Sequence, residues 1–194
     1  MIQIINYGAG NIRSVANALE KLDIDYEVIS SVKELSADAK LIFPGVGAAG
    51  SAMQNLKISG FDKALKNWRG PFLGICLGMQ LLMDSSKEND CNCLSIIPGS
   101  VEKFDNSLKV PQIGWNKVLG TTDPLFSELN EENYFYFVNS YRVVTDDQYV
   151  LGQCFYGECF PAAVRRENFY GVQFHPEKSG EPGLKLLSNF CNLC

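Results

Sequence analysis

A chain of 194 residues, of which 46% are hydrophobic and 20% charged, is long enough to bury one hydrophobic core and short for two. Its net charge of −5, with no block rich in Lys or Arg, argues against a nucleic-acid partner, because phosphate backbones are bound by clustered positive charge. The first residues lack a basic region followed by a long apolar stretch, and the sequence has no run of about 18 apolar residues. We therefore expect a single cytoplasmic domain over residues 1–194 with no membrane segment.

The first half of the chain alternates short apolar runs with helical patterns. Strands are predicted at 2–6, 25–30, 40–45 and 71–75, and helices at 11–22, 48–57, 61–68 and 77–86. Strands that alternate with helices through short connections predict a parallel sheet covered by helices on both faces.

The second half contains strand-like runs with few helical patterns between them. These runs lie at 110–119, 134–143, 149–156, 160–166 and 168–175, and a helix is predicted at 181–193. The sequence therefore predicts an α/β fold, a flavodoxin-like three-layer sandwich whose mainly parallel central sheet has an antiparallel extension in the second half.

Seven cysteines, an odd number, cannot all pair in disulfides, and reduced thiols fit a cytoplasmic protein better. Cys91 and Cys93 are closely spaced, as are Cys191 and Cys194. Zinc sites usually join two such pairs in one compact unit, whereas these pairs lie far apart in the chain. We therefore expect no metal, and no role is predicted for these four cysteines.

The segment GICLGMQ at 74–80 places Cys76 on a tight turn between a buried strand and a helix. Ligands of parallel sheets gather beyond the carboxyl ends of the strands, so this turn would present Cys76 to a crevice. Gly74 and Gly78 flank it with the spacing of a nucleophile elbow. The N-terminus of the following helix favours a thiolate and offers the Leu77 N–H to an oxyanion. This turn alone leaves a buried structural cysteine open as the alternative.

A thiolate nucleophile needs a base, and His175 is the only histidine in the chain. Pro176 favours extended backbone at His175, and in an extended stretch Glu177 lies on the same side as His175. A carboxylate there can orient the imidazole. The three residues together predict a catalytic triad of Cys76, His175 and Glu177.

Several motifs also carry a family resemblance. PGVG at 44–47, GICLGMQ at 74–80 and FHPEKS at 174–179 resemble, in this order and spacing, the triad-type class I glutamine amidotransferases. YGAGN at 7–11, GWN at 114–116, YFYFVNSY at 134–141 and GLKLLSNF at 183–190 narrow the resemblance to the glutaminase subunits of imidazole glycerol phosphate synthases, over essentially the full chain.

The resemblance implies a mechanism. Cys76 would attack the carboxamide of L-glutamine and form a thioester, while His175 protonates the departing ammonia and then activates water. Backbone N–H groups of Leu77 and of Val46 or Gly47 would hold the oxyanion. Gln80, Glu88 and the backbone around Asn139, Ser140 and Tyr141 would contact the substrate glutamine. No cofactor is implied.

The resemblance also implies a partner, a cyclase subunit with a (β/α)8 barrel that receives ammonia through an internal passage in histidine biosynthesis. The residues that would face it in this heterodimer are Asn11, Trp115, Tyr136 and Lys178. Trp115 could instead belong to the core, and Lys178 could be a solvated charge.

Gln112 and Asn139 stand where the family typically has histidine. These departures favour, as an alternative, a paralogous glutaminase that supplies another synthase, such as one that amidates surface sugars. A non-catalytic interaction subunit is less favoured, as is an unrelated thiol hydrolase or peptidase, because the triad and the glutamine-pocket motifs are intact. A dinucleotide-binding loop at GAGN is disfavoured, because Arg13 stands where the third glycine of that motif belongs.

Overall fold

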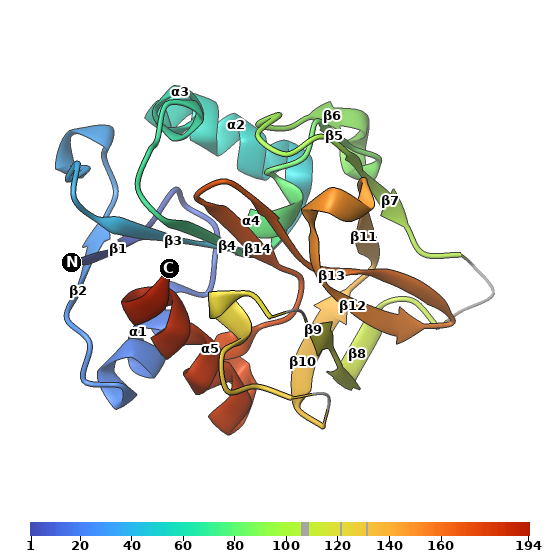
Figure 1. Ribbon diagram of the computed structural model, residues 1–194. Coiled ribbons are helices and arrows are strands. Elements are labelled where there is room, and N and C mark those ends of the chain that lie inside the picture. Colours follow the sequence, from blue (N-terminus) through green and yellow to red (C-terminus); the bar gives the residue numbers. More distant parts are fainter. Residues whose placement is uncertain (106–108, 121, 131) are drawn as a thin grey trace.

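The computed structural model describes residues 1–105, 109–120, 122–130 and 132–194 (Figure 1). Its centre is an eight-stranded sheet with the strand order β2-β1-β3-β4-β14-β13-β12-β9. The strands are β1 (Ile2–Ile5), β2 (Tyr26–Ile29), β3 (Lys40–Gly45), β4 (Phe72–Cys76), β9 (Leu119–Gly120), β12 (Val150–Tyr156), β13 (Glu158–Arg166) and β14 (Phe169–Val172).

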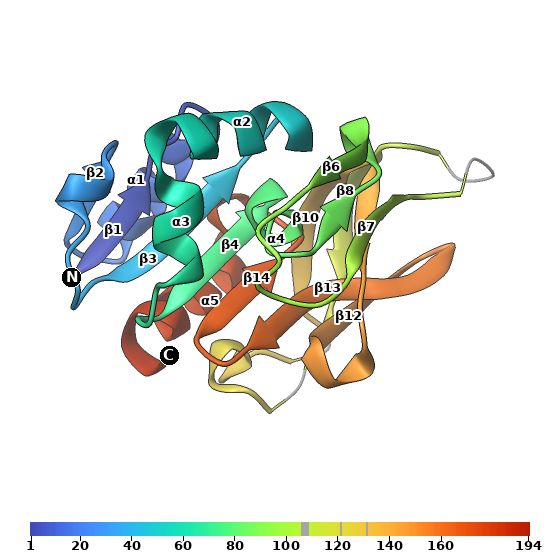
Figure 2. The same cartoon turned by 90° about the horizontal axis from the view of Figure 1, so that it is seen from above.

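The pairing directions divide this sheet into two parts. β2, β1, β3, β4 and β14 pair in parallel, whereas β13, β12 and β9 continue the sheet with antiparallel pairs. Figure 2 shows β12 and β13 side by side beyond the parallel part. The predicted fold class, a mainly parallel α/β sheet with an antiparallel extension, is confirmed.

Helices cover both faces of the parallel part (Figures 1 and 2). α2 (Ala49–Ser59) and α3 (Phe61–Lys66) lie on one face, and α1 (Ile12–Lys21) and α5 (Gly180–Leu193) lie on the other. Successive strand residues point to opposite faces. Leu41 and Phe43 accordingly pack in the core beneath α2 and α3, while Ile42 packs in the core with α1 and α5. Both faces are buried, which explains why these strands are apolar throughout.

Two smaller sheets complete the fold. β8 (Gln112–Lys117) pairs with β10 (Tyr134–Asn139), and a four-stranded sheet contains β11 (Tyr141–Val144), β7 (Ser100–Lys103), β5 (Ser85–Ser86) and β6 (Cys91–Asn92). The single run predicted at 134–143 is therefore two strands that leave Ser140 between different sheets. Short 3-10 helices connect other elements: η1 (Val32–Glu34), η2 (Glu88–Asp90), η3 (Pro124–Phe126), η4 (Asp147–Tyr149) and η5 (Pro176–Lys178).

The helix predicted at 77–86 is wrong beyond its first turn. α4 spans only Leu77–Gln80, and β5 begins at Ser85. The carbonyl groups of residues 81–83 accept hydrogen bonds from the backbone N–H groups of residues 94–97 instead of continuing a helix. A single turn sums few peptide dipoles, so the helix contributes less positive potential at Cys76 than the sequence suggested.

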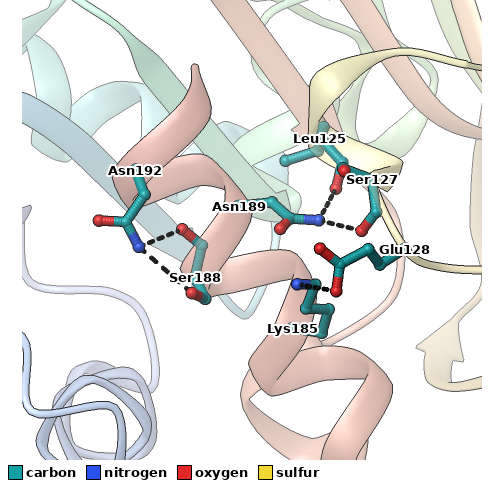
Figure 3. A network of polar contacts seen from close by, with 7 residues as sticks. All are labelled: Leu125, Ser127, Glu128, Lys185, Ser188, Asn189 and Asn192. Atoms are coloured by element: carbon teal, nitrogen blue, oxygen red, sulfur yellow. Dashed lines mark hydrogen bonds and ion pairs between the residues drawn. The ribbon is translucent and has the colours of Figure 1, made fainter.

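The C-terminal helix α5 is fixed to the loop around η3 (Figure 3). Asn189 Nδ2 donates to the carbonyl oxygens of Leu125 (3.1 Å) and Ser127 (2.7 Å), and Lys185 pairs with Glu128 at 2.7 Å. Because α5 follows η5 directly, these contacts help to hold the segment that carries residues 175–179.

Within the described ranges, none of the helices is both long and apolar enough to cross a membrane. The same ranges contain no group of three or more His, Cys, Asp or Glu side chains arranged to hold a metal ion. All seven cysteines are free thiols.

Candidate active site

Cys76 ends β4 and immediately precedes α4. Its backbone has φ 55° and ψ −109°, a conformation that is strained for a residue with a side chain. The sulfur lines a cavity, as the predicted elbow requires, yet the residue as a whole is only 9% exposed. The cysteine is thus presented to a cavity, while most of its own surface is shielded from solvent.

The two flanking glycines make this strained turn possible. A Cβ on Gly74 would lie 2.6 Å from the carbonyl oxygen of Gly78, and a Cβ on Gly78 would overlap the carbonyl oxygen of Phe43. Both neighbours are backbone atoms that cannot rotate away. The spacing of these glycines therefore reflects the close approach of α4 to β3 and β4.

His175 and Glu177 form a buried pair beside Cys76. The Nδ1 atom of His175 lies 2.8 Å from Oε1 of Glu177, and both side chains are nearly inaccessible to solvent. His175 has extended backbone, as Pro176 predicts, but residues 176–178 form the 3-10 helix η5 and not a continued strand. This turn still brings Glu177 to the imidazole. The turn is held by Ser179 Oγ, which donates to the carbonyl oxygen of His175 (2.6 Å).

The surroundings of His175 favour its charged form. Burial lowers the pKa of the imidazole, but the Cys76 sulfur and the Glu177 carboxylate outweigh burial and raise the pKa to about 10. Within the described residues, His175 Nε2 has no hydrogen-bond partner at the usual geometry. This nitrogen is the one left to exchange a proton with the sulfur and with a ligand.

This raised pKa predicts a pH-dependent contribution to stability. Between pH 6.5 and pH 10, the native protein keeps a proton on His175 that the unfolded chain, with a histidine pKa near 6.5, has lost. The contribution of this histidine to folding stability is therefore complete below pH 6.5 and disappears as the pH rises toward 10. Urea unfolding should therefore show the stability advantage of wild type over Glu177→Gln shrinking from about pH 6 to about pH 10. A difference in unfolding free energy between the two proteins that stays constant across this range would show that Glu177 does not raise the pKa of His175.

A cavity of about 360 Å³ gathers residues that the sequence had placed in one site. Cys76 and His175 line it together with all eight residues predicted for the oxyanion hole and the glutamine contacts: Val46, Gly47, Leu77, Gln80, Glu88, Asn139, Ser140 and Tyr141. The remaining lining residues are Pro111 and Val138. Glu177 lies behind His175 and is absent from the lining.

Two of these residues also have structural contacts. Glu88 Oε2 accepts the backbone N–H of Ala49 (2.8 Å) at the start of α2, so this carboxylate connects the cavity wall to that helix. Asn139 Nδ2 donates to the carbonyl oxygen of Tyr141 (3.0 Å), and Asn139 faces Gln112 across the β8–β10 pair. The two departures from the family pattern are therefore adjacent in space, and both are buried.

Three of the four residues predicted to face a partner lie together outside the cavity lining. The rings of Trp115 and Tyr136 meet edge to face at 5.9 Å, and Lys178 Nζ lies 6.0 Å from the Tyr136 ring centre. Trp115 is 54% exposed, so it is not a core residue. Asn11 lies apart in the sequence at the N-terminus of α1, where its side chain makes no capping hydrogen bond.

The sequence prediction missed two residues beside Cys76. Gln173 is fully buried and donates from Nε2 to the Cys76 sulfur at 3.7 Å. Its position two residues before His175 was the signal that could have found it, because alternate residues of extended chain share a face. The hydroxyl of Tyr7 is also buried, and burial together with the charge of Cys76 raises its pKa.

Comparison with known proteins agrees with this geometry. The family model described as glutamine amidotransferase class-I matches residues 3–193. Among the similar proteins are several named imidazole glycerol phosphate synthase subunit HisH. The one from Maridesulfovibrio salexigens is 45% identical to this chain, and the match covers 100% of this chain and 97% of that protein. The one from Methanocaldococcus jannaschii is also 45% identical, and the match covers 100% of both. The HisH of Herpetosiphon aurantiacus is 46% identical and covers 100% of this chain and 94% of its own length.

Solved structures support the fold at lower sequence identity. PurLQS from Thermotoga maritima superposes with a TM-score of 0.74 at 19% identity, covering 98% of this chain and 97% of that one. A glutamine amidotransferase from the same organism superposes with a TM-score of 0.62 at 16% sequence identity. The match covers 97% of this chain and 89% of that one. From the family match and the full-length relatives, this chain belongs to the class-I glutamine amidotransferases, in the group that contains the HisH proteins.

Proposed function

We propose that this chain is the glutaminase subunit of an imidazole glycerol phosphate synthase. It hydrolyses L-glutamine to glutamate and ammonia and passes the ammonia to a cyclase subunit. The observation that carries the proposal is the arrangement of Cys76, His175 and Glu177 at one cavity, in a chain 45% identical to HisH proteins over its full length.

The first half of the reaction forms a thioester. The Cys76 sulfur, having passed its proton to His175 Nε2, bonds to the carboxamide carbon of glutamine, and the C=O electrons move to oxygen. The Leu77 N–H and an N–H from Val46 or Gly47 stabilise this oxyanion. When it collapses, the C–N bond breaks and the imidazolium gives its proton to the nitrogen, which leaves as neutral NH₃.

The second half regenerates the thiol. His175 takes a proton from water, and the resulting hydroxide bonds to the thioester carbon. The C–S bond then breaks to release glutamate, and the Cys76 thiolate takes back the proton that His175 holds. Glu177 keeps the proton of the neutral imidazole on Nδ1, so that Nε2 is free to act as the base in both halves. Gln80, Glu88 and the backbone at 139–141 hold the amino-acid part of the substrate.

Neutral ammonia is useful to a second enzyme only if it reaches the acceptor before it is protonated, because NH₄⁺ has no lone pair for attack. This requirement supports a partner seated close to the cavity. Trp115 and Lys178, which are exposed, and Tyr136, which is half-buried, form an aromatic and cationic surface that suits such a partner, a barrel cyclase.

The direct test measures glutamate formation by the purified chain alone, with the cyclase subunit from the same genome, and with that cyclase plus its nucleotide substrate. We expect strong stimulation that depends on Cys76, with Cys76→Ser as the inactive control. A chain that releases no glutamate in any of the three conditions would contradict the glutaminase assignment.

A paralogous role stays as the second candidate because Gln112 and Asn139 lie together where the family typically has histidine. The same assay separates the two functions. The cyclase could fail to stimulate glutamate formation although Cys76 still reacts with an electrophilic glutamine analogue. This result would indicate that the glutaminase serves another synthase.

Trp115→Ala should weaken binding of the cyclase by about tenfold or more, because a buried tryptophan at an interface often dominates its energy. The dissociation constant, measured by titration calorimetry, checks this result. Ile58→Ala is the matched control, since Ile58 is 78% exposed on α2 and has no predicted contact with the partner. Equal affinity of the Trp115→Ala variant and wild type would remove Trp115 from the interface.

A further inference from the structure

Gln173 is fully buried next to the nucleophile, and each end of its amide has a side-chain partner. Its Nε2 donates to the Cys76 sulfur (3.7 Å), and its Oε1 accepts from Nε2 of Gln80 (2.9 Å). A primary amide has one donor end and one acceptor end. Gln173 therefore connects the sulfur of Cys76 with a side chain that lines the cavity, and the mechanism above makes no use of it.

The direction of these hydrogen bonds is fixed by the backbone. Gln80 Nε2 also donates to the carbonyl oxygen of Tyr141 (3.1 Å), and a carbonyl can only accept. The NH₂ group of Gln80 must therefore face Tyr141 and Gln173. Gln173 in turn must present its oxygen to Gln80, which turns its own N–H groups toward the sulfur.

The same contacts decide what Gln80 offers to a ligand. Both N–H groups of its amide are engaged by Tyr141 and Gln173, so its oxygen is the atom left for the cavity. An amide oxygen accepts hydrogen bonds from N–H groups. Gln80 would thus receive an N–H of the bound substrate and could not donate to a carboxylate.

We propose that Gln173 is a positioning residue that couples the nucleophile to substrate recognition. Its N–H stabilises negative charge on the Cys76 sulfur, and its oxygen holds Gln80 so that the Gln80 oxygen accepts from an N–H of the amino acid. The second half of this inference rests on the proposed glutaminase function, whereas the first half concerns the sulfur alone.

The first test uses the rate of alkylation of Cys76 by iodoacetamide as a function of pH in Gln173→Leu and Gln173→Met. Both replacements keep much of the side-chain volume and remove the N–H, and Met also matches the unbranched shape should Leu perturb folding. Because all seven cysteines are free thiols, the rate is read from the Cys76 peptide by mass spectrometry. The pH of half-maximal alkylation should rise by about one unit, the loss expected for one hydrogen bond to a charged group.

The second test separates binding from chemistry in the same variants. KM for glutamine should rise several-fold because Gln80 loses one of its two anchors, and kcat should fall because the thiolate is less stabilised. Gln3→Leu is the matched control. Gln3 is an equally buried glutamine on β1 whose amide bonds to Glu27 and to the Glu34 backbone, outside the cavity lining.

The outcomes distinguish this inference from the proposed function. Wild type that does not hydrolyse glutamine would overturn the proposed function, yet the alkylation profiles would still report on the sulfur. Folded Gln173 variants whose profiles superimpose on wild type would overturn the role at the sulfur. An unchanged KM would overturn the role at Gln80, and a shift of the profile in Gln3→Leu would show that the loss of any buried amide has the same effect.

Discussion

Glu177→Gln should lower kcat for glutamine hydrolysis by roughly 10²- to 10⁴-fold. The carboxylate lies 2.8 Å from His175 Nδ1 and accepts its N–H, which leaves Nε2 unprotonated in the neutral ring. An amide in its place can donate its own N–H to Nδ1. The ring proton then resides on Nε2, which can no longer take the proton from Cys76 or from water.

A second effect of this substitution acts in the same direction. Glu177 is one of the groups that raise the pKa of His175, so an uncharged glutamine lowers this pKa and weakens the imidazolium that must form beside the sulfur. KM should change much less than kcat, because Glu177 does not line the cavity. Steady-state kinetics with glutamine, in the presence of the partner, gives both constants.

Glu158→Gln is the matched control for the loss of a paired carboxylate. Glu158 pairs with Arg142 at 2.8 Å on β13, outside the cavity lining, so this variant should keep kcat within about twofold of wild type. A Glu177→Gln enzyme with kcat within about threefold of wild type, and with the normal fold by circular dichroism, would show that His175 needs no carboxylate.

The parts of the site that could be predicted from sequence depend on local geometry. Gly74 is required by the backbone of Gly78, which belongs to the same elbow, and Pro176 favours the extended backbone at His175. Gly78 is required by the more distant carbonyl of Phe43, but its spacing from Gly74 around the cysteine is a motif that can be recognised in the sequence. Since His175 is the only histidine in the chain, composition also singled out the base. Alternation of strands and helices was similarly sufficient for the parallel half of the sheet.

The parts that could not be predicted depend on contacts between distant segments. α4 ends at Gln80 because residues 94–97 take the carbonyls that a longer helix would use, and no local pattern reports this competition. The link from Gln80 through Gln173 to Cys76 joins side chains 93 and 97 residues apart. The break at Ser140 between two sheets is likewise a property of how the sheets assemble.

Gly78→Ala should destabilise the fold by about 3 kcal/mol or more and abolish measurable glutaminase activity. The added methyl group would overlap the carbonyl oxygen of Phe43 in β3. This oxygen belongs to the backbone of a buried central strand, so the clash can be relieved only by moving α4 away from the sheet. Such a movement displaces Cys76 and the Leu77 N–H from the cavity, and the reaction needs both in register.

Gly50→Ala is the matched control, because Gly50 also lies in the first turn of a helix but its added Cβ would meet only the Asn89 side chain at 3.1 Å. Alanine improves helix propensity, so this variant should remain within about 1 kcal/mol of wild type. Urea unfolding of the two variants and wild type, with alkylation of Cys76 in the folded fraction, measures both effects. The opposite result would be a Gly78→Ala variant that unfolds like wild type and hydrolyses glutamine at the normal rate. It would mean that β3 and α4 can separate without loss of the elbow, and the strained turn at Cys76 would then need another explanation.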